Sequence, residues 1–188
     1  QGEDIVREYR SQMRRQQRHR RDLDAKKTLP AETSDGLPIA LLANIDLPKE
    51  IELAVDNGAR GVGMYRTEFL YLNYRLPSEE EQFRAYAKIV EAMAPAPVTI
   101  RTIDLGGDKL SHVLDVKTED NPFLGWRGLR ICLDEPGLFK TQLRALLRAS
   151  SLGALRILLP MISGTQELVR TRALMEEVKD ELRESGEP

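Results

Sequence analysis

Four short apolar runs alternate with longer helix-like segments along this chain, and that alternation restricts its fold more than any other feature. The runs fall at residues 38–45, 61–65, 98–104 and 155–161. No two of them are separated by a tight turn alone, as the strands of a hairpin would be. Strands joined by helical crossovers run parallel. The sequence therefore predicts an α/β fold on a parallel sheet, and the first run predicts a strand buried on both faces because it is apolar almost throughout.

The segments between the runs carry the start and stop signals of helices. Pro48 suits the first turn of a helix, and Asn57 followed by Gly58 is a normal stop. Ser78 and Glu81 form the pattern of a capping box, in which each side chain bonds to the backbone of the other residue. Together these signals predict helices at about residues 48–57, 79–93, 136–147 and 166–183.

Two parallel architectures suit units of this length. With about 38 residues per unit, the chain could form a doubly wound sheet or part of an eight-fold β/α barrel of roughly 250 residues. Hydrophobic periodicity does not distinguish between them. In both architectures ligands bind where the carboxyl ends of the strands meet.

The first 27 residues differ in composition from the rest of the chain. They hold nine Lys or Arg against five acidic residues. Their apolar side chains are too sparse for an independent core. We predict a basic, solvated linker helix within residues 1–30 and a β/α domain over residues 31–188. A nucleic-acid or membrane patch is the alternative interpretation of the arginines in this segment.

The overall composition excludes several classes of protein. The net charge is −2, so no overall basic field favours nucleic acid. Cys132 is the only cysteine, which excludes a disulfide framework, and its apolar neighbours predict a buried, inert thiol. No apolar run approaches the roughly 20 residues that cross a bilayer, and the first residues lack the pattern of a secretory signal. We expect a cytoplasmic protein without nucleic-acid or membrane partners.

Arginine closes two of the predicted strands. Arg66 and Arg101 each precede a threonine at the carboxyl end of a run. Guanidinium groups bind phosphate or carboxylate oxygens through two parallel hydrogen bonds. We therefore predict that both arginines line one anion site. The alternative is a structural ion pair with a neighbouring acid, such as Glu68 or Asp104.

Further candidates follow the third run. Gly106 and Gly107 permit close approach of the backbone to a phosphate, and Lys109 adds a point charge. A plain turn is the alternative, since the spacing is not that of a Walker loop. Arg127 stands beside the only tryptophan, so it fits packing as well as ligand contact.

Six segments, in order, carry a specific resemblance. They are GVGMYRTEFLYL, LPSEEEQF, IRTIDLGGDK, NPFLGWRGLRICLD, LRALLRAS and LRILLPMI. From about residue 35 to the end, the chain resembles the phosphoenolpyruvate-binding barrel of the phosphoenolpyruvate–protein phosphotransferases, the Enzyme I family of the bacterial sugar phosphotransferase system. Pyruvate phosphate dikinase and phosphoenolpyruvate synthase share that barrel, but GGDK and NPFLGWR look closer to Enzyme I. A nitrogen-regulatory paralogue also fits.

The resemblance implies the first half, about four units, of a TIM-type barrel. It implies that Arg66 and Arg101 hold the phosphate of phosphoenolpyruvate and that Arg127 lies near the phosphoryl group. The phosphoryl group would pass to a histidine and then to a small phosphocarrier protein, with release of pyruvate. The family's swivelling phosphohistidine motif, magnesium ligands and acid cysteine do not appear in these 188 residues, so we expect the catalytic and Mg2+-binding residues outside them.

The same resemblance sets expectations for partners and for the isolated chain. It implies a homodimer in the parent enzyme. The 188-residue chain alone is expected to be inactive, and its uncovered strand edges predict non-native self-association. A non-catalytic anion-binding or interaction module is the alternative from another class of protein.

Overall fold

A computed structural model describes residues 2–71, 75–106 and 125–187 of the chain. Its sheet has four parallel strands in the order β1-β2-β3-β4. A doubly wound sheet would reverse its strand order at a switch point, and the four strands show no reversal. The sheet is open, and the predicted parallel α/β fold is confirmed. The strands are β1 (Ala43–Ile45), β2 (Val62–Tyr65), β3 (Val98–Arg101) and β4 (Leu155–Leu158).

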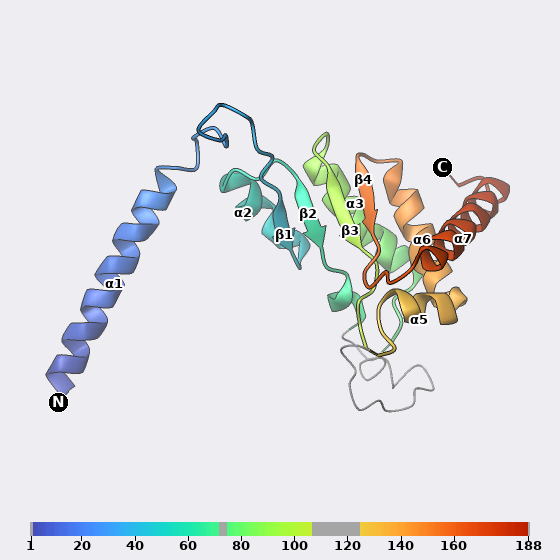
Figure 1. The fold of residues 1–188 in the computed structure, drawn as a ribbon, viewed down its shortest axis with the longest axis horizontal. Helices are drawn as coiled ribbons and strands as arrows, with labels where there is room; N and C mark the ends of the chain where they lie inside the picture. Colours follow the sequence, from blue (N-terminus) through green and yellow to red (C-terminus); the bar gives the residue numbers. More distant parts are fainter. Residues whose placement is uncertain (1, 72–74, 107–124, 188) are drawn as a thin grey trace.

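Helices pack against one face of the sheet (Figure 1). Helix α3 packs on β3 and on α6, and α6 packs on β4 and on α7. The crossovers between the strands therefore lie on the same side, as the predicted βα repeat requires. The helices are α2 (Ile51–Asp56), α3 (Glu79–Met93), α5 (Leu129–Asp134), α6 (Pro136–Ser150) and α7 (Thr165–Glu184), with short 3-10 turns η1 (Pro48–Glu50) and η2 (Glu68–Tyr71).

The alternation of side chains along β3 separates the two faces. Val98 and Ile100 are fully buried, whereas Thr99 and Arg101 are only partly covered. Successive side chains of a strand point to opposite faces, so the first pair meets the helices and the second pair faces the other side. The core between sheet and helices includes Leu146 of α6. Along β3, the opposite face thus carries polar side chains.

The predicted helix boundaries around α2 and α3 are confirmed. Ser78 Oγ accepts the Glu81 N–H at 3.2 Å, and the Glu81 carboxylate accepts the Ser78 N–H at 2.9 Å. This is the capping box that the sequence predicts. At the end of α2, Gly58 has φ of +87°, and a side chain there would also meet the Lys27 carbonyl oxygen. Only glycine adopts that backbone angle at little cost.

The first predicted strand is wrong in length and in burial. Only Ala43–Ile45 forms β1, and Ile39 and Leu41 are each about half exposed (49 % and 51 %). β1 pairs with β2 alone, so the preceding apolar residues have a neighbouring strand on one side at most. β3 and β4 are also shorter than predicted, and the short helix α5 was not predicted from the sequence.

Helix α1 (Gly2–Asp24) extends away from the sheet (Figure 1). Its apolar side chains Ile5, Tyr9 and Met13 are exposed. Across the described ranges, no helix has both the length and the apolar character needed to cross a membrane.

Candidate functional site

The register of the sheet brings the predicted arginines to one edge. Tyr65 of β2 pairs with Ile45 of β1 on one side and with Ile100 of β3 on the other. All three are buried against the helices, so the next residue of each strand turns to the opposite face. Those next residues are Asp46, Arg66 and Arg101.

Arg66 occupies the outer and more exposed part of this edge. Its Nη1 donates to Asp46 Oδ1 at 2.7 Å, and its side chain is 41 % exposed. The hydrogen bond to Asp46 raises the pKa of Arg66, which stays protonated at all relevant pH values. One exposed carboxylate therefore holds this guanidinium, and exposed pairs of this kind are weak.

Arg101 is held more tightly. Its Nη2 donates to Glu68 Oε1 at 2.8 Å, its Nη1 lies 3.0 Å from Asp104 Oδ2, and its side chain is 18 % exposed. Its Nε and the second oxygen of Glu68 are buried without a hydrogen-bond partner among the described residues. Buried polar atoms normally find a partner, so the described residues leave the Nε–H of Arg101 available for a further acceptor.

Asp104 joins Arg101 to Arg127. Arg127 Nε donates to Asp104 Oδ1 at 3.1 Å, and its Nη2 donates to the Asp104 carbonyl oxygen at 3.1 Å. A β-bridge between Gly106 and Arg127 brings the two segments together. Gly128 has φ of +57°, and a Cβ there would lie 3.2 Å from Asp104 Oδ1, so a glycine is needed beside the carboxylate.

The structure therefore places Arg66 beside Arg101 at the carboxyl ends of the strands and links Arg127 to Arg101 through Asp104. Glu68 and Asp104, the acids considered as structural ion-pair partners, lie at the same edge. Glu68 and Asp104 bind Arg101, whereas Arg66 pairs with Asp46, a partner that the sequence did not predict. Asp46 follows β1 directly, but only the strand register reveals that it lies beside Arg66. Ion pairing in this state does not exclude anion binding, because a guanidinium offers five N–H donors.

The glycine candidates are covered only in part. Gly106 is buried and bridges to Arg127. Gly107 and Lys109 lie outside the described residues, so their predicted phosphate contacts stay predictions.

The described residues do not fit a magnesium site. No group of three or more His, Cys, Asp or Glu side chains gathers within the described ranges. Glu68 and Asp104, the carboxylates beside Arg101, are bound by guanidinium groups. Cys132 is fully buried, as predicted, and burial raises the pKa of its thiol to about 12, which disfavours the reactive thiolate.

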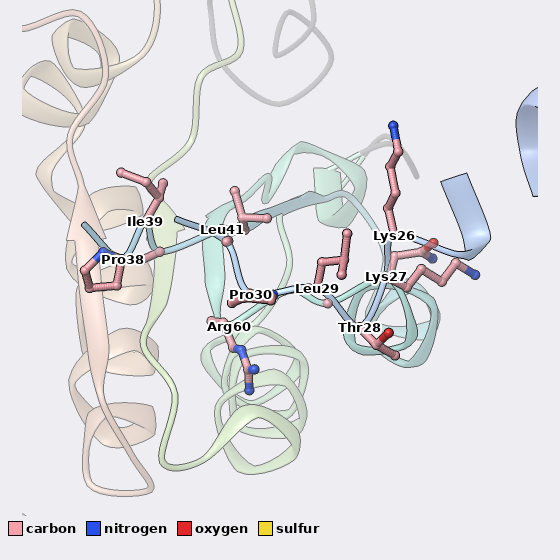
Figure 2. A pocket seen from close by; sticks show the side chains of 13 residues that line it. Lys26, Lys27, Thr28, Leu29, Pro30, Pro38, Ile39, Leu41 and Arg60 are labelled. Atoms are coloured by element: carbon pink, nitrogen blue, oxygen red, sulfur yellow. The ribbon is translucent and has the colours of Figure 1, made fainter. Parts of the chain in front are cut away.

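A pocket of about 690 Å3 lies at the other end of the sheet (Figure 2). Leu41 precedes β1 and Arg60 precedes β2, so the pocket adjoins the amino ends of these strands. Parallel βα proteins bind their ligands at the carboxyl ends, and the arginines lie there. The labelled residues around the pocket are Lys26, Lys27, Thr28, Leu29, Pro30, Pro38, Ile39, Leu41 and Arg60.

The fold and the site together define a βα-repeat protein with an arginine-rich edge suited to anions. Residues 20–188 match the family described as "PEP-utilising enzyme, PEP-binding domain", and the chain belongs to this family. This finding confirms the resemblance inferred from the six segments.

Three curated relatives carry the description "Phosphoenolpyruvate-protein phosphotransferase". The relative from Staphylococcus carnosus is 43% identical over 186 residues, which is 98% of this chain and 32% of the relative. The relative from Haemophilus influenzae is 49% identical over 161 residues, or 85% of this chain and 28% of the relative. The relative from Cupriavidus necator is 46% identical over 190 residues, which is 97% of this chain and 32% of the relative. The chain thus spans about a third of the length of these relatives.

Proposed function

We propose that this chain is part of a phosphoenolpyruvate–protein phosphotransferase and supplies part of its substrate site. The enzyme would move the phosphoryl group of phosphoenolpyruvate to a histidine and on to a small phosphocarrier protein, releasing pyruvate. The family match and the names of the relatives support this activity. The observation that carries the assignment of the site is the side-by-side placement of Arg66 and Arg101 on the open face of the sheet.

Each arginine would contribute differently to phosphate binding. Arg66 would exchange its exposed bond to Asp46 for a bond to a phosphate oxygen, which costs little because exposed ion pairs contribute about 0–1 kcal/mol. Arg101 would present a guanidinium that Glu68 and Asp104 already orient, so less side-chain freedom is lost on binding. Arg127 would add a third positive charge near the phosphoryl group, where charge spreads during transfer.

The remaining parts of the enzyme would lie outside this chain. We place the Mg2+ ligands, the acceptor histidine and the proton donor there, along with the strands that would close a TIM-type barrel. Bound magnesium would neutralise phosphate charge in the intact enzyme. We propose that the enzyme acts in the cytoplasm, that it serves sugar uptake, and that it assembles as a homodimer. Gly107 and Lys109 remain proposed phosphate contacts.

The test replaces each arginine by alanine in the intact enzyme. A charge-assisted hydrogen bond contributes about 1.5 to 3 kcal/mol, so Arg66→Ala and Arg101→Ala should each lower kcat/KM for phosphoenolpyruvate at least tenfold. Release of pyruvate in the presence of phosphocarrier protein is the measurement. Arg84→Ala is the control, because Arg84 is an exposed residue of α3 that pairs with Glu80. Unchanged kinetics in both site variants would reject the assignment.

The 188-residue chain alone should release no pyruvate. We expect weak, salt-sensitive binding of phosphoenolpyruvate, of order millimolar or about 4 kcal/mol, measured by titration calorimetry. Turnover by the isolated chain would mean that the acceptor or the metal site has been misplaced. The names of the relatives favour a phosphotransferase over a dikinase, a synthase or a non-catalytic anion-binding module.

A further inference from the structure

A glutamine on the helical side of the sheet reaches the strand ends that carry the arginines. Gln142 of α6 is fully buried. Its Oε1 accepts the Ile103 N–H at 3.0 Å. Its Nε2 donates to the Tyr86 hydroxyl at 3.1 Å and lies 3.4 Å from Thr67 Oγ1. Such an amide is costly to bury without partners, and here both ends of the amide are satisfied.

Two partners of this amide, Thr67 and Ile103, lie shortly after Arg66 and Arg101 in the chain. Thr67 comes directly after Arg66 and is fully buried. Its hydroxyl donates to the Arg101 carbonyl oxygen at 3.1 Å. Ile103 lies two residues after Arg101 and directly before Asp104. Gln142 therefore bonds to the two residues that directly precede Glu68 and Asp104. These are the carboxylates that hold the Arg101 guanidinium.

Ile103 is the point at which the chain leaves the sheet. The Thr102 N–H still donates to the Leu158 carbonyl oxygen at 3.0 Å, as in a strand ladder. The next N–H, that of Ile103, donates to Gln142 instead. Asp104 follows, and its carboxylate binds Arg101 and Arg127. The position of that carboxylate thus depends on a backbone turn that Gln142 stabilises.

We propose that Gln142 is a positioning residue for the anion site. It holds the strand ends so that Asp104 and Arg101 keep the geometry that phosphate binding requires, although it does not touch the ligand. This role rests on the proposed function of the site. A methionine would fill a similar space in the core but would leave the Ile103 N–H without the acceptor that Gln142 provides.

The matched control is a second buried glutamine of the same hydrogen-bond network. Gln82 of α3 accepts the Tyr86 hydroxyl at 3.0 Å and lies 3.4 Å from the Tyr71 hydroxyl, and its Nε2 donates to the Pro77 carbonyl oxygen. None of these partners belongs to a strand end. Gln142→Met and Gln82→Met both remove a buried amide from Tyr86, but only the first releases Ile103.

The experiment compares both variants in the intact enzyme. We expect Gln142→Met to weaken phosphoenolpyruvate binding about tenfold by calorimetry and to raise KM more than it lowers kcat. Gln82→Met should change the affinity less than twofold, even when thermal unfolding shows a similar loss of stability. Equal effects of the two variants on affinity, or no effect of Gln142→Met, would overturn the proposal.

A second readout separates this proposal from the proposed function. Amide hydrogen exchange of Ile103 in the chain itself should be at least tenfold faster in Gln142→Met than in Gln82→Met. If the wild-type enzyme binds no phosphoenolpyruvate, the proposed function is wrong, and these exchange rates decide alone whether Gln142 fixes the turn. Equal rates would reject it. Should Gln142→Met fail to fold, Thr67→Val tests the same tether and should weaken binding about threefold; an unchanged affinity would count against the tether.

Discussion

The half of the sheet around β1 (the β1 side) and the half around β3 (the β3 side) differ in how completely their side chains are buried. On the β1 side, a three-residue strand is followed by the six-residue helix α2, and Leu41 and Leu53 stay largely exposed. On the β3 side, α3 and α6 each have 15 residues, and Tyr86 and Leu146 are fully buried. The apolar surface that stabilises a fold is thus concentrated on one side of this molecule.

The candidate site contains residues from both the β1 side and the β3 side of the sheet. Arg66 is paired with Asp46, which belongs to the β1 side, whereas Arg101 is held by Glu68 and Asp104 within the well-packed side. The difference shows that one half of the site is fixed by the folded core and the other half is held by a single exposed ion pair. Perturbing the two sides separately should therefore have distinct effects on association, stability and binding.

The largest expected effect is on the molar mass of the isolated chain. The exposed apolar side chains beside the β1 edge are a template for pairing with another chain, so we expect light scattering to show at least a doubling of mass as the concentration rises. Ile39→Lys with Leu41→Lys should restore the monomer, because charge on an edge opposes pairing. A wild-type monomer over a wide range of concentration would contradict this expectation.

The second prediction compares one leucine from each side. Leu146→Ala should lower the free energy of unfolding by about 2 to 5 kcal/mol, because it leaves a cavity in the core. Leu53→Ala, at a side chain that is 64% exposed, should change it by less than about 0.5 kcal/mol. Urea denaturation measures both values. Similar losses would show that the β1 side is packed as well as the β3 side.

The sequence predicted features that local chemistry decides. The Ser78 capping box, the Gly58 stop and the placement of Arg66 and Arg101 at strand ends all depend on neighbouring residues or on the general geometry of parallel sheets. The acidic partners of Arg101, Glu68 and Asp104, lie close enough in sequence to be considered.

Features that depend on distant packing could not be predicted in the same way. The run at residues 38–45 is apolar, but its composition does not say what covers it, so most of it was wrongly predicted to be a buried strand. Gln142 lies 39 residues from Ile103 and 75 from Thr67, and no local pattern marks it as different from other helical glutamines. The six residues of α5 are too few to show a helical period.

The third prediction compares the two arginines by stability rather than by activity. Arg101→Ala removes the partner of two largely buried carboxylates, so it should cost on the order of 2 kcal/mol, between the values for exposed and buried pairs. Arg66→Ala removes an exposed pair and should cost less than about 1 kcal/mol. Chemical denaturation of the isolated chain measures both. Equal costs would show that Arg66 is as firmly embedded in the fold as Arg101.

The smallest effect should come from the exposed cap of α3, even though this helix belongs to the well-packed side. The Glu81 carboxylate is bonded by Arg75 and by the Ser78 N–H and hydroxyl, and these bonds lower its pKa from the usual 4.5 to about 2. A pKa that is lower in the folded state stabilises the fold above the unfolded value, and this contribution disappears as the pH falls from about 4.5 to about 2. Glu81→Gln should therefore be less stable than the wild type at pH 7, and the difference should shrink towards zero near pH 2.

Glu91→Gln, at the carboxyl end of the same helix, is the control and should be neutral or slightly stabilising, because a negative charge is unfavourable there. Urea denaturation at several pH values measures the difference; a gap between wild type and Glu81→Gln that stays constant across this range would show that the ionised carboxylate contributes nothing.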